Sequence, residues 1–500
     1  MEHAGVRASQ NGLKQIKVTR NTEEDHEGEH EPLSPIARMF HEPGSNVYIL
    51  FSLGFKDPLD PQTLKANLLA TVLKHPRFSS VQIADEKNGG LKWVQTEVDL
   101  DNHIIVVPKQ DMETKAADKF VEDYMANLSK TNLSMSIPMW DAHILNLKTS
   151  DGAESHLMFR VHHSLGDGTS FISLLLSCSR KLSDPHALPT FPIPTKKPTT
   201  SSTLSRRLIG VWIRFWSTFL LLWNTLIDML LCVATMYFLK DTQTPLKAPS
   251  AAVAFTSRRI VRQTFSLPDV KFVKNATKTT VNDVLVAITE AALSRYLNRK
   301  YGMIIKKKES AEWENNLPKN IRFTTTLFMN LRSSPGIHPL DEMMKRKSKA
   351  EWGNKIGYVI FPFTIELKDN PLDHIREVKA RMDRKKASLE AKFRYFMATV
   401  FLRFYRTKLA IFPATTMWFS NVPGPQDKIS LFGNEVVYVA PSLFGQPVSL
   451  TINIVSYADT ISMILAVDEN IIPDVYQLCD DLEESLKLLK KSVVAEGLNN

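Results

Sequence analysis

A long apolar run in the middle of the chain is the feature that most restricts how this sequence can fold. Between Leu208 and Leu239 only Arg214 and Asp228 carry a charge. About twenty apolar residues can cross the hydrocarbon core of a bilayer, and Phe215 to Val233 reaches that length. Aromatic residues that favour a membrane interface recur along the run, at Trp212, Trp216, Trp223 and Tyr237. The run therefore predicts contact with a membrane.

Three placements of this run have to be weighed. The run is too short for two spans of about twenty residues each. It can cross the membrane once, lie in or re-enter the interface, or form a long buried core helix. Apolar residues on all faces disfavour the buried helix. Basic residues flank both sides, which favours one compartment for both flanks: Lys196, Lys197, Arg206 and Arg207 before, and Lys240, Lys247, Arg258 and Arg259 after. We predict a re-entrant or in-plane interfacial helix whose Arg214 and Asp228 turn to headgroups or protein.

A second constraint is the segment His162-His163-Ser164-Leu165-Gly166-Asp167-Gly168, which ends a run of alternating apolar residues. The alternation places His163 on the apolar face of a strand and His162 on the opposite face. Partial desolvation keeps such an imidazole neutral near pH 7, as a general base requires. Apolar spacing then predicts a helix over Thr169 to Leu182. In the alternative interpretation, His162 and His163 are ordinary strand-end residues and Asp167 only caps the helix. The Asp-Gly pair at a fixed distance from the histidines favours an acyl-transfer site instead.

Several segments of the chain together resemble a known family. The heptapeptide matches the HHxxxDG signature of CoA-dependent acyltransferases built on the chloramphenicol acetyltransferase fold. Other segments follow in family order: Pro32-Leu33-Ser34-Pro35, Pro138-Met139-Trp140, Asn282-Asp283-Val284, Asn330-Leu331-Arg332, Trp352-Gly353-Asn354 and Ser420-Asn421-Val422-Pro423-Gly424-Pro425. From about Pro32 onward the chain resembles the plant branch of the bifunctional wax ester synthase/diacylglycerol acyltransferase family. One departure is Met139, where the family has leucine, a change expected to alter pocket shape and not chemistry.

The resemblance implies a mixed α/β fold of two chloramphenicol-acetyltransferase-like halves with an inserted hydrophobic helix. We predict a flexible tail over residues 1–31, an N-terminal half over 32–187, a linker with the hydrophobic helix over 188–250, and a C-terminal half over 251–500. Because the family site needs both halves together, a single membrane crossing between them is disfavoured. Sequence patterns in the C-terminal half predict strands at 260–265, 323–331 and 356–363, a hairpin of 448–456 with 460–467, a helix over 281–297, and an amphipathic region over 372–410.

The resemblance also implies roles for individual residues. His163 is expected to be the general base, with His162 and Gly168 supporting it. Asn282 is expected near the catalytic channel, where it positions substrate or the site loop with support from Asp283, although plain helix capping explains this pair about as well. Arg332 is a candidate loop anchor that pairs with Asp167, which would make the carboxylate structural and not catalytic.

Charge and cysteine content restrict the partners. The net charge of +9 comes from dispersed basic residues, without nucleic-acid-binding motifs, so an anionic substrate or membrane is favoured and no nucleic acid is expected. Cys178, Cys232 and Cys479 form no CxxC pair, which supports neither a disulfide framework nor a zinc site. Cys178 follows the motif most closely and is expected to be buried and not a nucleophile. We expect no metal and no cofactor, with acyl-CoA as co-substrate.

The resemblance implies acyl transfer from acyl-CoA to long-chain fatty alcohols, giving wax esters, with diacylglycerol as a further acceptor and no covalent enzyme intermediate. It also implies a role in cuticular wax and a site at the endoplasmic reticulum membrane, both halves facing the cytosol, or at the plasma membrane. One alternative is a soluble BAHD-like acyltransferase of another alcohol, but that family's DFGWG motif does not occur here. A non-catalytic lipid-binding homologue is the other alternative, and the intact motif argues against it.

Overall fold

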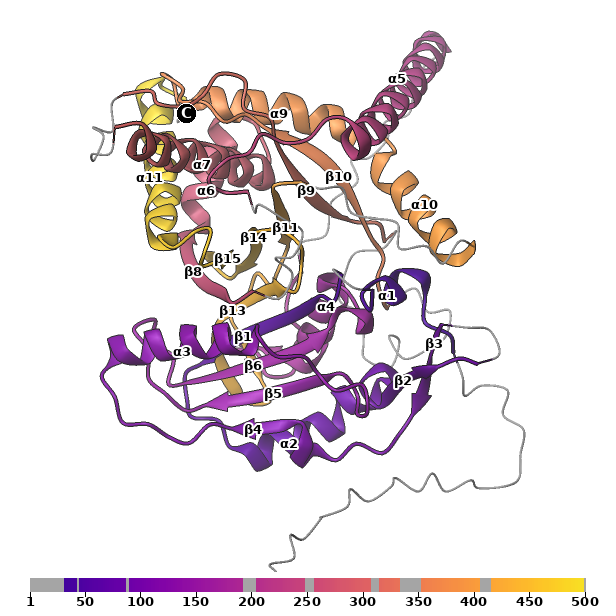
Figure 1. Cartoon of the computed structure of the whole chain (residues 1–500), viewed down its shortest axis with the longest axis vertical. Coiled ribbons are helices and arrows are strands. Elements are labelled where there is room, and N and C mark those ends of the chain that lie inside the picture. Colours follow the sequence, from indigo (N-terminus) through magenta and orange to yellow (C-terminus); the bar gives the residue numbers. More distant parts are fainter. Residues whose placement is uncertain are drawn as a thin grey trace, which may run out of the picture.

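The computed structural model describes residues 31–42, 45–86, 90–191, 204–247, 256–306, 314–332, 352–404 and 415–498. All but the last residue of the predicted N-terminal tail lies outside these ranges, as do residues 192–203 and 248–250 of the predicted linker region. The described residues form two lobes, each built on its own β-sheet (Figure 1). Each lobe has its own apolar core. The predicted two-lobed α/β fold is therefore confirmed.

The first lobe contains a seven-stranded sheet of order β4-β5-β6-β1-β13-β12-β7. Its strands, in sheet order, are β4 (Ile104–Val106), β5 (Trp140–Leu145), β6 (Ser155–His162), β1 (Tyr48–Phe55), β13 (Asn434–Phe444), β12 (Ile429–Leu431) and β7 (Ser179–Lys181). A hairpin of β2 (Ser80–Ala84) with β3 (Leu91–Gln95) lies apart from this sheet. The helices are α1 (Pro35–Met39), α2 (Pro61–Ala70), α3 (Thr114–Leu128) and α4 (Gly168–Cys178).

Two strands of the first sheet come from the C-terminal half of the chain. β13 pairs with the central strand β1 in antiparallel register from Tyr48↔Phe444 onward, and β12 pairs with β13 and β7. All residues of β1 are buried, because the strand lies inside the sheet between β6 and β13. A boundary at residue 250 therefore separates β12 and β13 from the sheet that they complete.

The second lobe contains a six-stranded sheet of order β10-β9-β11-β14-β15-β8. Its strands are β10 (Ile356–Phe363), β9 (Phe323–Asn330), β11 (Met417–Val422), β14 (Leu450–Tyr457), β15 (Thr460–Asp468) and β8 (Arg258–Ser266). Its helices are α6 (Leu267–Ala276), α7 (Val281–Lys306), α9 (Leu372–Lys386), α10 (Glu390–Phe404) and α11 (Val475–Ala495). The long helices α7, α9 and α11 gather on the side of this sheet away from the first lobe (Figure 1).

Most predicted elements of the C-terminal half are confirmed. β10 has the predicted bounds, and β14 and β15 form the predicted hairpin, with Ala458 in the left-handed region at φ 49°. The amphipathic region from 372 contains two helices, α9 and α10. Two predicted helix ends are wrong. α7 continues to Lys306, and α4 stops at Cys178 because the chain then enters the edge strand β7.

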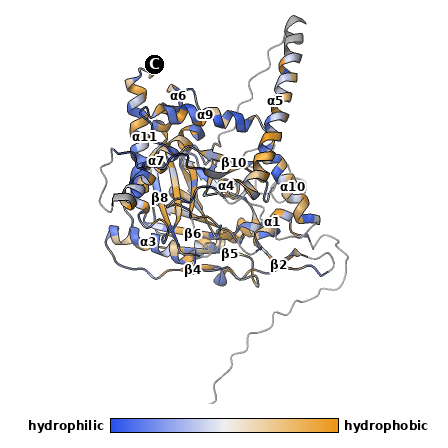
Figure 2. Ribbon diagram, turned by 45° about the horizontal axis from the view of Figure 1, so that its top comes forward, coloured by the Kyte–Doolittle hydropathy of each residue, from blue (hydrophilic) through white to orange (hydrophobic). Residues whose placement is uncertain are grey.

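The apolar run forms one long helix, α5 (Leu204–Tyr237), which projects from the body beside α10 (Figures 1 and 2). Among the described residues, one helical segment is long and apolar enough to cross a membrane by length and composition, Trp212–Tyr237, and it is only 11% buried. A buried core helix, one of the three placements considered, is therefore excluded. Every residue from Trp212 to Leu220 is exposed.

The expectation that α5 is apolar on all faces is wrong. Its polar residues recur at intervals of three, four and seven, which places them on one face of a helix: Arg214, Ser217, Thr218, Asn224, Thr225, Asp228 and Thr235. Large apolar residues occupy the opposite side, including Trp212, Phe215, Phe219, Trp223, Leu226 and Leu230, all of them exposed. The high apolar content of the run had obscured this periodicity.

Candidate active site

The HHxxxDG segment forms the predicted strand, loop and helix. β6 lies between β1 and β5 and ends at His162, so His163 is not on the strand but begins a 3-10 turn, His163–Leu165. Asp167 then caps α4, since its Oδ1 accepts a hydrogen bond of 2.9 Å from the backbone N–H of Ser170. The chain direction changes sharply at the first histidine, and the two imidazoles contact different surroundings.

His163 lines a cavity of about 310 Å³ at the junction of the two lobes. Its ring stacks on Phe40 with ring centroids 4.1 Å apart. Burial lowers the pKa of His163 below its ordinary value of 6.5. The imidazole is therefore neutral near pH 7 and able to accept a proton.

Asn354 fixes which nitrogen of His163 is basic. The amide Nδ2 of Asn354 donates to the main-chain carbonyl of His163 at 2.8 Å, which orients the amide. Its Oδ1 then faces Nδ1 of the imidazole at 3.1 Å, and an amide oxygen only accepts hydrogen bonds. Nδ1 must therefore carry the proton, which leaves Nε2 as the basic nitrogen.

His162 does not line the cavity. Its Nε2 lies 2.9 Å from Oδ1 of Asn46 and 3.1 Å from the carbonyl of Phe40, and its Nδ1 lies 2.7 Å from Oγ of Ser164. Burial lowers the pKa of His162 well below 6.5. His162 thus contacts the carbonyl of Phe40, and the ring of Phe40 stacks on His163. His162 therefore supports His163 indirectly, through Phe40.

Asp167 and Arg332 form a buried ion pair between the lobes. Nη1 of Arg332 donates to Oδ2 of Asp167 at 2.8 Å, and the backbone N–H of Lys355 donates to the same oxygen at 2.9 Å. Nη2 of Arg332 also reaches the carbonyl of Gly353 at 2.7 Å. The pairing implied by the resemblance is thus present in the structure. Because its oxygens are engaged by the helix and by the second lobe, Asp167 acts as a loop anchor.

The segment Trp352-Gly353-Asn354 makes contacts with the first lobe that residue patterns alone did not reveal. Nε1 of Trp352 donates to the carbonyl of Leu165 at 2.8 Å, and Gly353 adopts φ 114°, a left-handed conformation that glycine tolerates. The whole segment thus lies against the loop of the HHxxxDG motif. In the sequence this segment stood out only because it matches a segment of the family. That match did not indicate what its residues contact.

The Asn282-Asp283 pair lies at the start of α7. Asp283 and Thr280 cap each other, since the N–H of Thr280 donates to Asp283 at 2.9 Å and the N–H of Asp283 donates to Thr280 at 3.2 Å. Asn282 accepts a hydrogen bond of 3.2 Å from Asn421, which lines the cavity. Asp283 therefore caps α7. Asn282 does not line the cavity itself but hydrogen-bonds to Asn421, which does.

The remaining motif glycines differ in how strictly they are required. A Cβ on Gly168 would touch only Cγ2 of Val422, at 3.4 Å. A Cβ on Gly424 would lie 2.0 Å from the carbonyl oxygen of Ser456, so this position excludes any side chain. The Pro423-Gly424-Pro425 turn therefore needs glycine to pass close to β14.

The cavity wall is mainly apolar, with a few polar groups. The apolar lining includes Phe40, Ile49, Phe51, Phe191, Phe328, Trp418, Val422 and Ile454, and the uncharged polar lining includes Asn330, Ser420, Asn421, Ser442 and Asn453. No cysteine is among the residues that line it, and burial raises the pKa of Cys178. Nowhere in the described parts of the chain do three His, Cys, Asp or Glu side chains gather as a metal site requires.

Comparison with known proteins gives consistent matches. Residues 57–285 match the wax ester synthase/diacylglycerol acyltransferase catalytic domain, and residues 352–490 match the WS/DGAT C-terminal domain. Wax ester synthase/diacylglycerol acyltransferase 7 of Arabidopsis thaliana is 44% identical over 94% of this chain and 99% of its own length. Wax ester synthase/diacylglycerol acyltransferase 5 of the same plant is 40% identical over 97% of this chain and 97% of its own length.

Solved structures share the fold at low sequence identity. A wax ester synthase/diacylglycerol acyltransferase from Marinobacter aquaeolei VT8 aligns with a TM-score of 0.54 and 18% identity over 93% of this chain and 99% of its own. The starter condensation domain of rhizomide synthetase RzmA aligns with a TM-score of 0.54 and 11% identity, over 93% of this chain and 94% of that one. The two-lobed architecture is thus common to proteins of widely different sequence.

Proposed function

Because this chain belongs to the wax ester synthase/diacylglycerol acyltransferase family and is an acyltransferase, we propose that it esterifies long-chain fatty alcohols with acyl groups from acyl-CoA. The products are wax esters, and diacylglycerol is a further acceptor that gives triacylglycerol. The observation that carries the proposal is His163, a neutral imidazole with its Nδ1 held by Asn354 in a mainly apolar cavity between the lobes. A role in cuticular wax is part of the same proposal.

In the proposed reaction His163 is the general base. Its Nε2 takes the proton of the acceptor hydroxyl while the oxygen attacks the thioester carbonyl of acyl-CoA. The tetrahedral intermediate collapses with cleavage of the carbon–sulfur bond, and the imidazolium returns the proton to the departing CoA thiolate. Uncharged donors in the wall, among them Ser420, Asn421 and Asn453, are available to the transient oxyanion.

The reaction proceeds by direct transfer, without an acyl-enzyme. A thioester is already activated toward an alcohol, so holding both substrates in line and removing one proton is sufficient. The apolar wall limits access of water, which competes with the alcohol for the acyl group. The chain needs no cofactor beyond acyl-CoA as co-substrate.

The proposed location is the endoplasmic reticulum membrane, with both lobes in the cytosol, where acyl-CoA and membrane-dissolved acceptors meet; the plasma membrane is the other candidate. Helix α5 supports a membrane location, since its outer part is apolar and exposed. Membrane lipid is therefore a proposed partner alongside acyl-CoA, fatty alcohol and diacylglycerol.

The proposal is tested by expressing the chain in cells that lack neutral-lipid synthesis and supplying fatty alcohol. Wax ester is expected, and the ratio of wax ester to triacylglycerol gives the acceptor preference. A folded His163→Ala variant should produce neither. Full activity in that variant would refute the assignment of the base, and absence of both products from the unaltered chain would indicate a non-catalytic lipid-binding protein.

A further inference from the structure

We propose that α5 and α10 form a docking surface for a single membrane leaflet, with α5 lying along the interface and Asp228 fixing it to the catalytic body. The partner is a lipid bilayer with anionic headgroups. This inference rests on the proposed membrane location, and it is independent of the acyl-transfer reaction.

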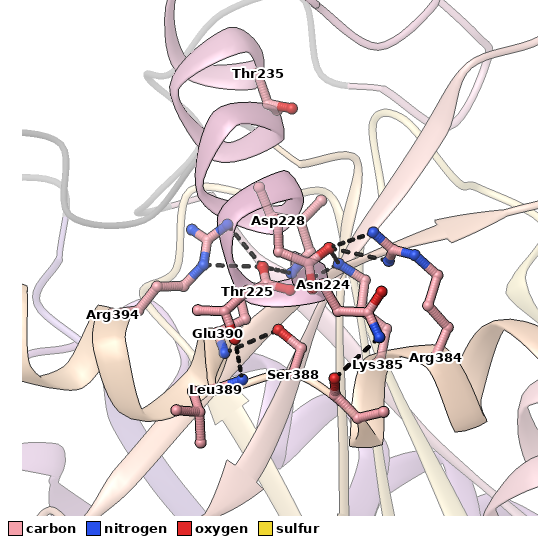
Figure 3. A network of polar contacts seen from close by, with 12 residues as sticks. Asn224, Thr225, Asp228, Thr235, Arg384, Lys385, Ser388, Leu389, Glu390 and Arg394 are labelled. Carbon is pink, nitrogen blue, oxygen red and sulfur yellow. Dashed lines mark hydrogen bonds and ion pairs between the residues drawn. The ribbon is translucent and has the colours of Figure 1, made fainter. Parts of the chain in front are cut away.

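The inner part of α5 is fastened to the second lobe by a buried ionic network (Figure 3). Asp228, on the polar face of α5, accepts hydrogen bonds of 2.9 Å from Nη1 and Nη2 of Arg384 and from Nζ of Lys385. Lys385 also donates to Glu390 at 2.6 Å, and Glu390 accepts from Nε of Arg394 at 2.9 Å. A carboxylate so placed is paired with protein and is not in lipid.

Neutral hydrogen bonds on both sides of Asp228 extend this attachment. Nδ2 of Asn224 donates to the carbonyl of Ala387 at 3.0 Å, and the N–H of Leu389 donates to Oγ1 of Thr225 at 2.9 Å. Further along the helix, Arg322 donates to Oγ1 of Thr235 at 3.0 Å. These contacts join α5 to the α9–α10 connection and to the residues before β9, so the helix has one defined direction relative to the cavity.

Both ends of α5 lead back to the same body. Before it, the chain leaves the cavity wall at Phe191 and passes through residues 192–203, which contain Pro192, Pro194 and Pro198 with Lys196 and Lys197. Twelve residues thus separate Phe191 from Leu204, fewer than the about twenty that a helical span needs. After α5, Asp241 is buried and accepts from the N–H groups of Thr324 and Thr416 at 2.9 and 3.1 Å. The attachment of both flanks to one body therefore favours an in-plane α5 over a single crossing.

The distribution of side chains on α5 fits an interfacial orientation. Its polar face continues from Asp228 through Thr218 and Ser217 to the exposed Arg214, and the opposite face is apolar along the whole projection. From Leu208 to Trp223 the rise is about 24 Å, less than the roughly 30 Å of a hydrocarbon core. Perpendicular insertion would bury Arg214 in lipid, whereas an in-plane helix leaves it among headgroups.

Helix α10 adds a second apolar patch to the same flank. Phe393 and Phe396 are 42% and 60% exposed, and α10 runs along the flank from the base of α5 in both views (Figures 1 and 2). In the described parts of α5 and α10 the exposed charged side chains are all basic, namely Arg214, Lys392 and Arg403. Apolar aromatic residues beside basic ones are what an anionic leaflet binds.

Vesicle flotation of the purified full chain tests the surface, with phosphatidylcholine vesicles that contain or lack phosphatidylserine. The chain should float, more strongly with phosphatidylserine. Phe219→Asn, on the apolar face, should weaken binding about tenfold or more, as loss of one lipid-buried aromatic side chain implies. Ser217→Asn, two residues away on the polar face, is the matched control and should float like the unaltered chain. Equal loss in both variants, or no flotation of the unaltered chain, would overturn the proposal.

The one-sided topology is tested by labelling sealed microsomes with a membrane-impermeant maleimide, using Ser202→Cys and Lys240→Cys and the unaltered chain as background. Both cysteines should react before detergent is added. Reaction of one of them only after permeabilisation would show a crossing and contradict the inference. Acyl transfer to a short, water-soluble alcohol is measured in parallel. If that activity is absent while flotation and labelling are as expected, the proposed reaction fails and the docking surface stands.

Discussion

Asn354 holds His163 at two points, its Nδ2 on the main-chain carbonyl and its Oδ1 on the imidazole Nδ1. The carbonyl can only accept, so the amide orientation is determined, and with it the tautomer of the imidazole. The two residues lie 191 positions apart in the chain. The basicity of a group in the first lobe is therefore controlled by a side chain of the second.

Changing Asn354 should alter the pH dependence of activity. In the proposed reaction neutral His163 is the active form, so kcat/KM should rise with pH through its pKa, which burial places below 6.5, and should be flat above. Asn354→Asp puts a negative charge beside Nδ1, which stabilises the imidazolium and should move the acidic limb to higher pH. Asn354→Leu should lower kcat roughly tenfold or more, with little change in the KM for acyl-CoA. An acidic limb that stays in place in Asn354→Asp would contradict this role.

The Asp167–Arg332 pair should prove structural. Asp167→Asn or Arg332→Gln leaves one buried charge without its counter-ion, which typically costs about 3–5 kcal/mol of unfolding free energy. The double variant should lose less than the sum of the single ones, because the pair is already absent. Asp373→Asn, in the exposed pair with Arg376, is the control and should change stability by at most about 1 kcal/mol. In the proposed reaction Asp167 transfers no proton, so residual activity should keep its pH profile, and a shifted profile would indicate a catalytic carboxylate.

Asp228→Leu should release α5 from the body. Arg384 and Lys385 lose their shared acceptor, so backbone amides of residues 224–235 should exchange hydrogen faster, while those of β6 stay protected. Esterification of a long-chain alcohol in vesicles should fall more than that of a short soluble alcohol, because the cavity remains intact. An equal fall for both acceptors would mean that Asp228 supports the catalytic lobe itself.

The chain should lose stability on mild acidification, in part because of His75. Burial lowers the pKa of His75 to about 3, against 6.5 when unfolded. The unfolded chain then binds more protons, so the unfolding free energy falls as pH drops below 6.5, by about 2 kcal/mol at pH 5 from this group alone. His75→Asn should reduce this slope, since its side chain can still accept from the N–H of Arg77, as Nδ1 of His75 does at 3.3 Å. Chemical denaturation at pH 5 and 7 measures how far the unfolding free energy falls in each chain. An equal fall in the unaltered chain and in His75→Asn would exclude His75 as the cause.

The sequence predicted local features well. The bounds of β10 and the β14–β15 hairpin follow from alternation and turn residues, which act over a few positions. The histidine motif and the resemblance also led to the cavity and to the Asp167–Arg332 pair. The contact of Asn354 with His163 could not be predicted, because its partners are far apart in sequence and the asparagine follows no periodic pattern.

Two other features were missed for different reasons. The crossing of β13 into the first sheet depends on edge pairing that alternation does not specify. The polar face of α5 was missed because so many apolar residues surround Arg214, Ser217 and Thr218 that composition outweighed their spacing.

The position of β13 has a consequence for the order of events during synthesis. β1 emerges from the ribosome early, but its partner on one side is not made until Phe444 has been added. Until then the first lobe has an open edge where β13 will lie, and Pro441, Ser442 and Leu443 of the cavity wall are missing. The nascent chain therefore has an incomplete cavity wall and an exposed strand edge, of the kind that favours aggregation, until only the last 56 of its 500 residues remain to be made.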